Sequence, residues 1–136
     1  MSIENILGIA GSALDAQSER ISIIAENMAN ASSVQSPDGG PYQRRIPVFE
    51  SATVGDDSGQ ASGVKLAAVL RDQSPAKETY DPSNPLADAS GMVQEPNVNP
   101  VFEMVDLMEA SRAYQANLSV VETAKNTALR TIDILK

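Results

Sequence analysis

Both ends of the chain carry long apolar stripes of helical period, and this pattern is the strongest constraint on the fold. Between residues 3 and 31, apolar side chains recur at alternating spacings of four and three, and no proline interrupts them. Such a repeat keeps one side of a helix facing a partner helix. The stripe consists of Ile3, Leu7, Ala10, Leu14, Gln17, Ile21, Ile24, Met28 and Ala31, with Gln17 as its one polar member. A long first helix is therefore predicted.

A second helix is predicted over residues 100–136. Asn99 is suited to cap it, and Pro100 fits the first helical position because its missing N–H needs no partner there. The apolar stripe consists of Met104, Leu107, Ser111, Tyr114, Leu118, Val121, Lys125, Ala128, Ile132 and Leu135, with Ser111 and Lys125 as exceptions. Packing the two stripes together removes both from water. We predict a mainly α fold in which two long terminal helices form an antiparallel, coiled-coil-like hairpin.

The middle of the chain has a different composition. Residues 32–99 hold seven of the eight prolines and many Gly, Ser and Asp residues. Strand character is present in residues 42–49, 64–70 and 77–80, and residues 55–63 are typical of a mobile loop. Turns are expected at 83–85 and 90–91. The predicted organisation is a helix in residues 1–33, a loop-rich insertion with short β-strands in 34–99, and a helix in 100–136.

Composition excludes several classes of function. The chain has no His and no Cys, which removes the commonest general base, thiolate nucleophiles and Cys-ligated metal sites. A net charge of −8 argues against nucleic acid as a partner. No apolar run is long enough for a transmembrane helix, and the N-terminus lacks the features of a cleavable signal peptide. We predict no cofactor, and either a cytoplasmic location or export by another route.

Acidic residues in the middle segment leave two chemical alternatives. The first alternative is a paired-carboxylate hydrolase that uses Asp56, Asp57 and Asp81. Against it, the chain has only two Phe, three Tyr and no Trp, so it has few aromatic side chains that could stack a sugar. A calcium site at residues 56–59 lacks the EF-hand spacing and its terminal Glu. The simpler interpretation is an acidic loop that aids solubility.

Two glycines stand inside the first predicted helix, Gly8 and Gly11. Each costs about 1 kcal/mol relative to Ala. Four interpretations stay open: a simple imperfection, a helix that starts later, a close helix–helix approach, and a helix made labile before assembly.

Several motifs resemble those of flagellar axial proteins, the family of rod, hook and hook-associated proteins. The N-terminal signature is similar to residues 9–17 and 24–31, and the C-terminal one to residues 80–93, 96–99, 103–106 and 110–117. The residues that carry the resemblance are Asn27, Asn30, Pro96, Asn97, Val98, Asn99, Glu103, Met104, Arg112, Tyr114 and Asn117. The short length and the Tyr80-Asp81-Pro82 segment resemble a proximal rod subunit more than the longer distal rod and hook proteins.

The resemblance implies a structural subunit of the basal-body rod and no enzymatic activity. Such subunits leave the cell through the flagellar type III export apparatus and do not insert into the membrane. They assemble helically with copies of themselves and with other rod proteins into a shaft that transmits torque. The expected core and assembly positions are Leu7, Leu14, Ile21, Ile24, Met28, Met104, Leu107, Tyr114, Leu118, Val121, Ile132 and Leu135. A soluble helical-hairpin adaptor or secretion chaperone is the alternative.

Overall fold

In sequence order, two long helices flank a middle segment that contains four strands. The computed structural model describes residues 3–37, 39–54 and 61–134. The elements are α1 (Ile3–Ala29), β1 (Arg45–Val54), β2 (Ala61–Arg71), β3 (Lys77–Tyr80), β4 (Met92–Glu95) and α2 (Pro100–Ile134). The chain is therefore mainly helical, with two small antiparallel sheets, β1–β2 and β3–β4.

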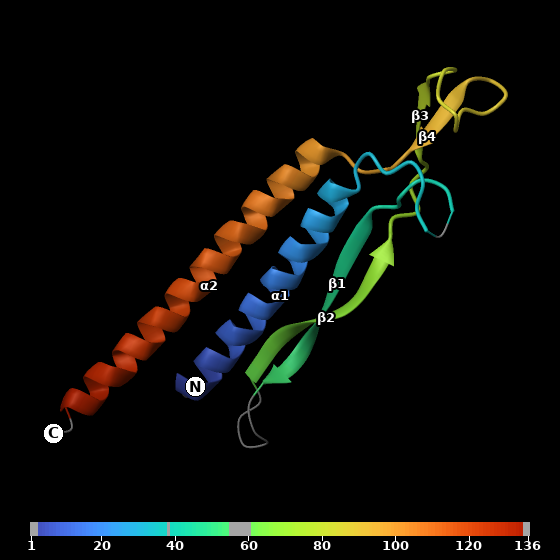
Figure 1. Cartoon of the computed structure of the whole chain (residues 1–136). Coiled ribbons are helices and arrows are strands. Elements are labelled where there is room, and N and C mark those ends of the chain that lie inside the picture. The colour runs from blue at the N-terminus through green and yellow to red at the C-terminus, as the bar shows by residue number, and fades with distance from the viewer. Residues whose placement is uncertain (1–2, 38, 55–60, 135–136) are drawn as a thin grey trace.

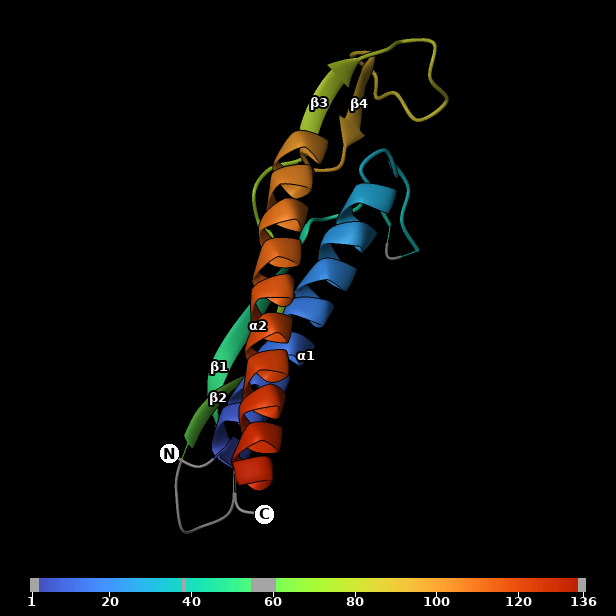
Figure 2. The same cartoon turned by 90° about the vertical axis from the view of Figure 1, so that its left-hand side faces the viewer.

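The two helices lie side by side and run in opposite directions (Figures 1 and 2). Arg20 of α1 forms ion pairs with Asp106 and Glu109 near the start of α2, at 3.9 and 3.6 Å. The Asn99 side chain accepts a hydrogen bond from the Val101 amide at 3.0 Å, which confirms the predicted cap of α2. Toward its C-terminus, α2 continues past Ile3, the first described residue of α1 (Figure 1).

Helix α1 is the central layer, with α2 on one side and the β1–β2 hairpin on the other (Figure 1). A Cβ atom at Gly8 would overlap the Val54 side chain of β1. Ser12 accepts a hydrogen bond from the Val64 amide of β2 at 3.2 Å. Gly8 therefore serves a close approach, but to a strand and not to a helix. No other segment of the described chain comes within 4 Å of a Cβ placed at Gly11, so that glycine has no packing explanation.

The β-segments follow the sequence prediction in part. Strand β3 coincides with the predicted 77–80, whereas residues 61–63 of the predicted loop belong to β2. The rest of that loop, residues 55–60 with the calcium-site candidate, lies outside the described residues. Strand β4 was not predicted, because it directly follows the turn at 90–91 and precedes Pro96. It pairs with β3 from Tyr80–Met92 to Lys77–Glu95. The predicted turn before it contains Gly91, whose φ of +79° favours glycine.

The surface of α2 that faces α1 differs from the predicted stripe at every second position. Leu107, Tyr114, Val121 and Ala128 are half-buried. The alternate positions on this surface are Glu103, Ala110, Asn117 and Ala124. The predicted stripe instead has the residues that follow each of these, Met104, Ser111, Leu118 and Lys125. Met104, Leu118 and Ile132 are 54%, 42% and 55% exposed. Small alanines bring the helices close together, and the larger side chains next to them are left facing outward.

The α1 stripe lies closer to its expected position. Ile24 is buried, Leu14, Ile21 and Met28 are half-buried, and Leu7 is exposed. Leu135 lies outside the described residues. Ala16 and Ile23 are also buried. They follow Ser12 at helical spacing, so they lie on the same side of α1 as Ser12, the side that faces the hairpin. The sequence prediction assigned α1 one partner, whereas it has two.

Gln17, the polar member of the α1 stripe, has a buried side-chain oxygen with no hydrogen-bond partner among the described residues. Gln17→Met keeps the side-chain length and removes this unsatisfied acceptor. We expect the free energy of unfolding to rise by about 1–2 kcal/mol, measured by urea denaturation. Gln115→Met, at an exposed position of α2, is the matched control. A midpoint for Gln17→Met at or below that of the parent chain contradicts the prediction.

Candidate functional site

A buried cluster of polar side chains joins the end of α1 to the start of α2. We call Asn27, Tyr42, Arg44, Asn97 and Glu103 the polar node. Asn27 is only 1% exposed. Its Nδ2 donates to the Arg45 carbonyl at 2.9 Å and to Glu103 Oε2 at 3.1 Å. Its Oδ1 accepts from the Tyr42 hydroxyl at 2.9 Å and from the Arg45 amide at 2.8 Å. The side chain thus uses both of its donors and both acceptor positions.

Glu103 brings a negative charge into this cluster. Its side chain is fully buried, and its Oε1 accepts from Arg44 Nε at 2.5 Å. The same guanidinium reaches Asp106 at 3.2 Å. A buried carboxylate is tolerated only when it is paired and hydrogen-bonded, and here Arg44 and Asn27 meet both conditions. Burial raises the pKa of the Tyr42 hydroxyl, and the nearby carboxylate of Glu26 raises this pKa further.

Asn97 extends the node to the segment after β2. Its Oδ1 accepts from the Arg44 amide at 2.8 Å, and its Nδ2 donates to the carbonyls of Asp72 and Ser74 at 3.1 and 3.0 Å. One amide side chain therefore holds three backbone segments together. The node fixes where the β1–β2 and β3–β4 hairpins leave the helix pair.

The node gathers three of the motif residues, Asn27, Asn97 and Glu103, although Asn27 and Glu103 are 76 positions apart in sequence. Asn30, Pro96, Val98 and Met104 are near these residues in sequence, whereas Arg112, Tyr114 and Asn117 lie two to four turns farther along α2. Asn30 donates to the Glu26 carbonyl and accepts from Ser33, and Pro96 and Val98 are buried. Tyr114 and Asn117 are half-buried toward α1, and Met104 and Arg112 are exposed. Sequence reasoning gave no role to Tyr42 and Arg44. The one signal for them was that residues 40–45 and 48–50 also resemble a proximal rod subunit.

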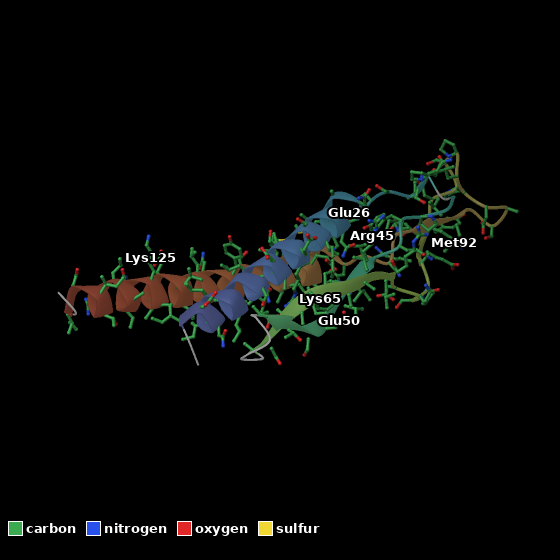
Figure 3. The ribbon with its side chains drawn as sticks, turned by 90° about the horizontal axis from the view of Figure 1, so that it is seen from below. Glu26, Arg45, Glu50, Lys65, Met92 and Lys125 are labelled. Atoms are coloured by element: carbon green, nitrogen blue, oxygen red, sulfur yellow. The ribbon has the colours of Figure 1, made fainter. Side chains whose placement is uncertain are left out.

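Two ion pairs support the hairpin from outside. Arg45 pairs with Glu26 at 3.0 Å, next to the node, and Lys65 pairs with Glu50 at 3.0 Å across the β1–β2 ribbon (Figure 3). Both pairs are largely exposed, so each contributes little to stability. Lys125, an exception in the predicted stripe, extends from α2 into solvent (Figure 3). These charges belong to a solvated surface.

Three Asp-x-Ser turns shape the segment between β2 and β4. In each, one carboxylate oxygen accepts from the amide and the hydroxyl of the serine two residues on. The pairs are Asp72–Ser74, Asp81–Ser83 and Asp88–Ser90. The serine hydroxyl bond is the main cause that lowers the pKa of each aspartate below its ordinary value. Asp81, named as a candidate catalytic carboxylate, is thus a turn residue.

These turns are expected to loosen in acid. Because each folded-state pKa lies below the unfolded value of 3.8, the stabilisation is present above pH 3.8 and is lost as the pH falls through the folded value. We expect the amide resonances of Ser83 and Ser90 to shift with midpoints below 3.8 in an NMR titration from pH 6 to pH 2. Midpoints at 3.8 or above contradict the prediction.

The described residues show no sign of metal or membrane chemistry. They contain no group of three acidic or other metal-ligating side chains placed to hold an ion. Within the same residues, no helix is long and apolar enough to cross a membrane. A hollow of about 890 Å³ lies beside the node, with walls that include Asn30, Tyr42, Arg71 and Gln94. It is open and mostly polar, and no catalytic set of side chains lines it.

The first turns of α2 present a large apolar surface to solvent. Val101, Met104, Val105 and Met108 are each at least half exposed. Their spacing of i, i+3, i+4 and i+7 places them on one side of the helix, away from Glu103 and Ala110, which face α1. We call these four residues the outer patch. Contiguous exposed apolar surface of this kind marks an interaction site.

Comparisons with known proteins agree with this picture of an interacting structural chain. Residues 89–134 match the family described as "Flagellar basal body rod FlgEFG protein C-terminal". The flagellar basal-body rod protein FlgC of Salmonella typhimurium is 51% identical over 135 residues, which cover 98% of each chain. FlgC of Escherichia coli O157:H7 is 50% identical with the same coverage. FlgC of Agrobacterium fabrum is 42% identical over 94% of this chain and 91% of its own. The chain therefore belongs to the FlgC family of flagellar basal-body rod proteins.

Proposed function

We propose that this chain, a structural rod protein and not an enzyme, assembles through its terminal helices into the proximal part of the flagellar rod. The observation that carries the proposal is the distribution of apolar side chains on α2. Within one molecule Ala110 and Ala124 are buried and Leu107, Tyr114 and Val121 are half-buried, while Met104, Leu118 and Ile132 stay in solvent. An isolated protein gains nothing from such a surface, whereas a subunit buries it on assembly.

The terminal helices and the middle segment therefore have different proposed roles. Residues 1–33 and 100–136 form an antiparallel, coiled-coil-like hairpin that makes the contacts of the shaft. Residues 34–99 form an insertion held at a fixed angle by the polar node. A rod that transmits torque must be stiff, and close side-chain packing together with satisfied polar networks supplies stiffness.

The partners proposed for the chain are copies of itself, other rod proteins and the flagellar type III export apparatus. The proposed location is the periplasmic part of the basal body. A head-to-tail interface that does not close into a ring generates a helical shaft. Among the assembly positions proposed from the sequence, Leu7, Met104, Leu118 and Ile132 are exposed in the single chain and available for such contacts.

Purification of basal bodies tests the proposal against the adaptor or chaperone alternative. A tagged chain expressed from its own promoter is expected to sediment with intact basal bodies and to resist washing with high salt. A soluble adaptor or chaperone instead remains in the supernatant. A strain that lacks the chain is expected to have no complete rods and no motility. Complete rods in that strain rule out the proposed function.

A further inference from the structure

The open hollow beside the polar node has two arginines in its wall. Arg45 of β1 and Arg71 of β2 are direct cross-strand partners, and both line the hollow. Like charges directly opposite each other destabilise a ribbon. Among the described residues that line the hollow, Glu26 is the one acidic side chain. Two arginines against one glutamate leave an excess positive charge, on a chain whose net charge is −8. This local excess favours an anionic ligand.

The guanidinium of Arg45 has unused hydrogen-bond donors. Both of its contacts with Glu26, at 3.0 and 3.1 Å, are made by Nη1. Its Nε and Nη2 groups bond to no other residue of the described chain. A guanidinium has five N–H donors, so Arg45 can hold a second carboxylate without releasing Glu26. Arg71 has a partner of its own within the chain, but it is also exposed and faces the same space.

The rest of the wall suits a polypeptide. Three exposed glutamines line the hollow, Gln35, Gln43 and Gln94, and their side chains bond to no other described residue. A primary amide both donates and accepts, as a peptide group does, so each of them can pair with an extended backbone. Among the described lining residues, Tyr42 is the one aromatic, and its hydroxyl is bonded to Asn27. The hollow therefore offers little aromatic surface on which a sugar could stack.

We propose that this hollow binds an acidic, extended segment of another protein, with one carboxylate of that segment held between Arg45 and Arg71. The volume of about 890 Å³ lies within the range of ligand pockets. Asn97 and Tyr42 line the hollow and belong to the polar node. The node therefore fixes the walls before binding, and a preformed site loses little entropy when it is occupied. The site lies in the middle segment and does not depend on the contacts proposed for the terminal helices.

Peptide binding to the purified full-length chain tests the proposal. The probe is a short fluorescein-labelled peptide of Gly, Ser and Pro with two adjacent glutamates, and its control has glutamines in their place. We expect fluorescence anisotropy to show that the acidic peptide binds about fivefold more tightly, or better, at low salt. High salt is expected to remove this difference, because it screens exposed charges. Equal affinity for the two peptides at low salt overturns the proposal.

Substitution of the arginines locates the binding. Arg71→Gln and Arg45→Gln are each expected to weaken binding of the acidic peptide by about fivefold or more, and circular dichroism verifies that each variant is folded. Lys65→Gln is the matched control, because it also breaks an exposed ion pair of the ribbon, with Glu50, but does not line the hollow. We expect its affinity to equal that of the parent chain. Unchanged affinity in either folded arginine variant, or an equal loss in Lys65→Gln, contradicts the proposal.

An oligogalacturonide, which is a carboxylated glycan, tests the other class of ligand. We expect it to bind more weakly than the acidic peptide, since its sugar rings find little aromatic surface in the hollow. Tighter binding of the glycan shows that the ligand is not a polypeptide, and the proposal is then wrong. Each of these measurements is made on the purified chain. Failure of this site therefore leaves the structural role intact, which sedimentation with basal bodies tests separately.

Discussion

Replacing Asn27 by alanine is expected to lower the free energy of unfolding by about 3–5 kcal/mol. The change leaves the Tyr42 hydroxyl and the backbone of Arg45 without their partner, and it removes one of two groups that hold the buried Glu103 carboxylate. Urea denaturation followed by circular dichroism measures the loss. For a chain of this length, a thermal midpoint lowered by roughly 10 °C or more accompanies it.

Asn126→Ala makes the same chemical change at an exposed position of α2 and is expected to stay within about 0.5 kcal/mol of the parent chain. Equal midpoints for the two variants would show that the polar node does not stabilise the fold. Asn27→Asp adds a further test, because it places a second carboxylate against Glu103 and removes a donor. It is expected to be at least as destabilising as alanine near neutral pH and milder in acid.

Leu118→Asp is expected to abolish motility while leaving the single chain folded. Leu118 is 42% exposed in the molecule, so an aspartate there costs the isolated chain less than about 1 kcal/mol. In the assembled rod the position is proposed to be buried, and a buried unpaired carboxylate costs several kcal/mol in every copy. Swimming in soft agar and images of purified basal bodies measure the effect, and circular dichroism of the purified variant verifies the fold.

Asn126→Asp adds the same charge on the same helix at another exposed position, one outside the predicted apolar stripe, and it is expected to swim normally. The expected pattern is therefore one folded but non-motile variant and one motile variant. A Leu118→Asp strain that swims at the normal rate contradicts an assembly role for this surface. A variant that is unfolded in isolation would instead show that Leu118 belongs to the core of the single chain.

The helices were predictable because their signal is local. A 3.5-residue repeat, a capping Asn99 and a following Pro100 give the boundaries of α2 to within a residue or two. It was harder to predict which side of each helix packs against its partner. Apolar periodicity finds the largest hydrophobic stripe, but the single chain buries Ala110 and Ala124 and exposes Met104 and Leu118. Periodicity does not distinguish a surface buried within the chain from one buried between chains.

The polar node was beyond prediction for a different reason. Its residues come from four separate segments, and each looks ordinary where it stands: a Glu in the first turn of a helix, an Asn near the end of another. Only the fold brings Asn27 to Glu103, Tyr42 to Asn27 and Arg44 to Glu103. The family motifs marked Asn27, Asn97 and Glu103 without indicating their common role. Likewise, the second partner of α1 depended on pairing between β1 and β2, which no pattern within α1 records.

The central position of α1 affects the order in which the chain reaches its native state. One side of α1 is covered by the β1–β2 hairpin and the other by α2. The first segment to be synthesised is therefore fully packed only when the last segment is in place. Isolated amphipathic helices owe most of their stability to packing, and here the contact from Asn27 to Glu103 spans 76 residues. Until α2 is available, α1 can pack only against the β1–β2 hairpin. The complete native structure therefore becomes available only when the final 35-residue helix is free to pack on α1.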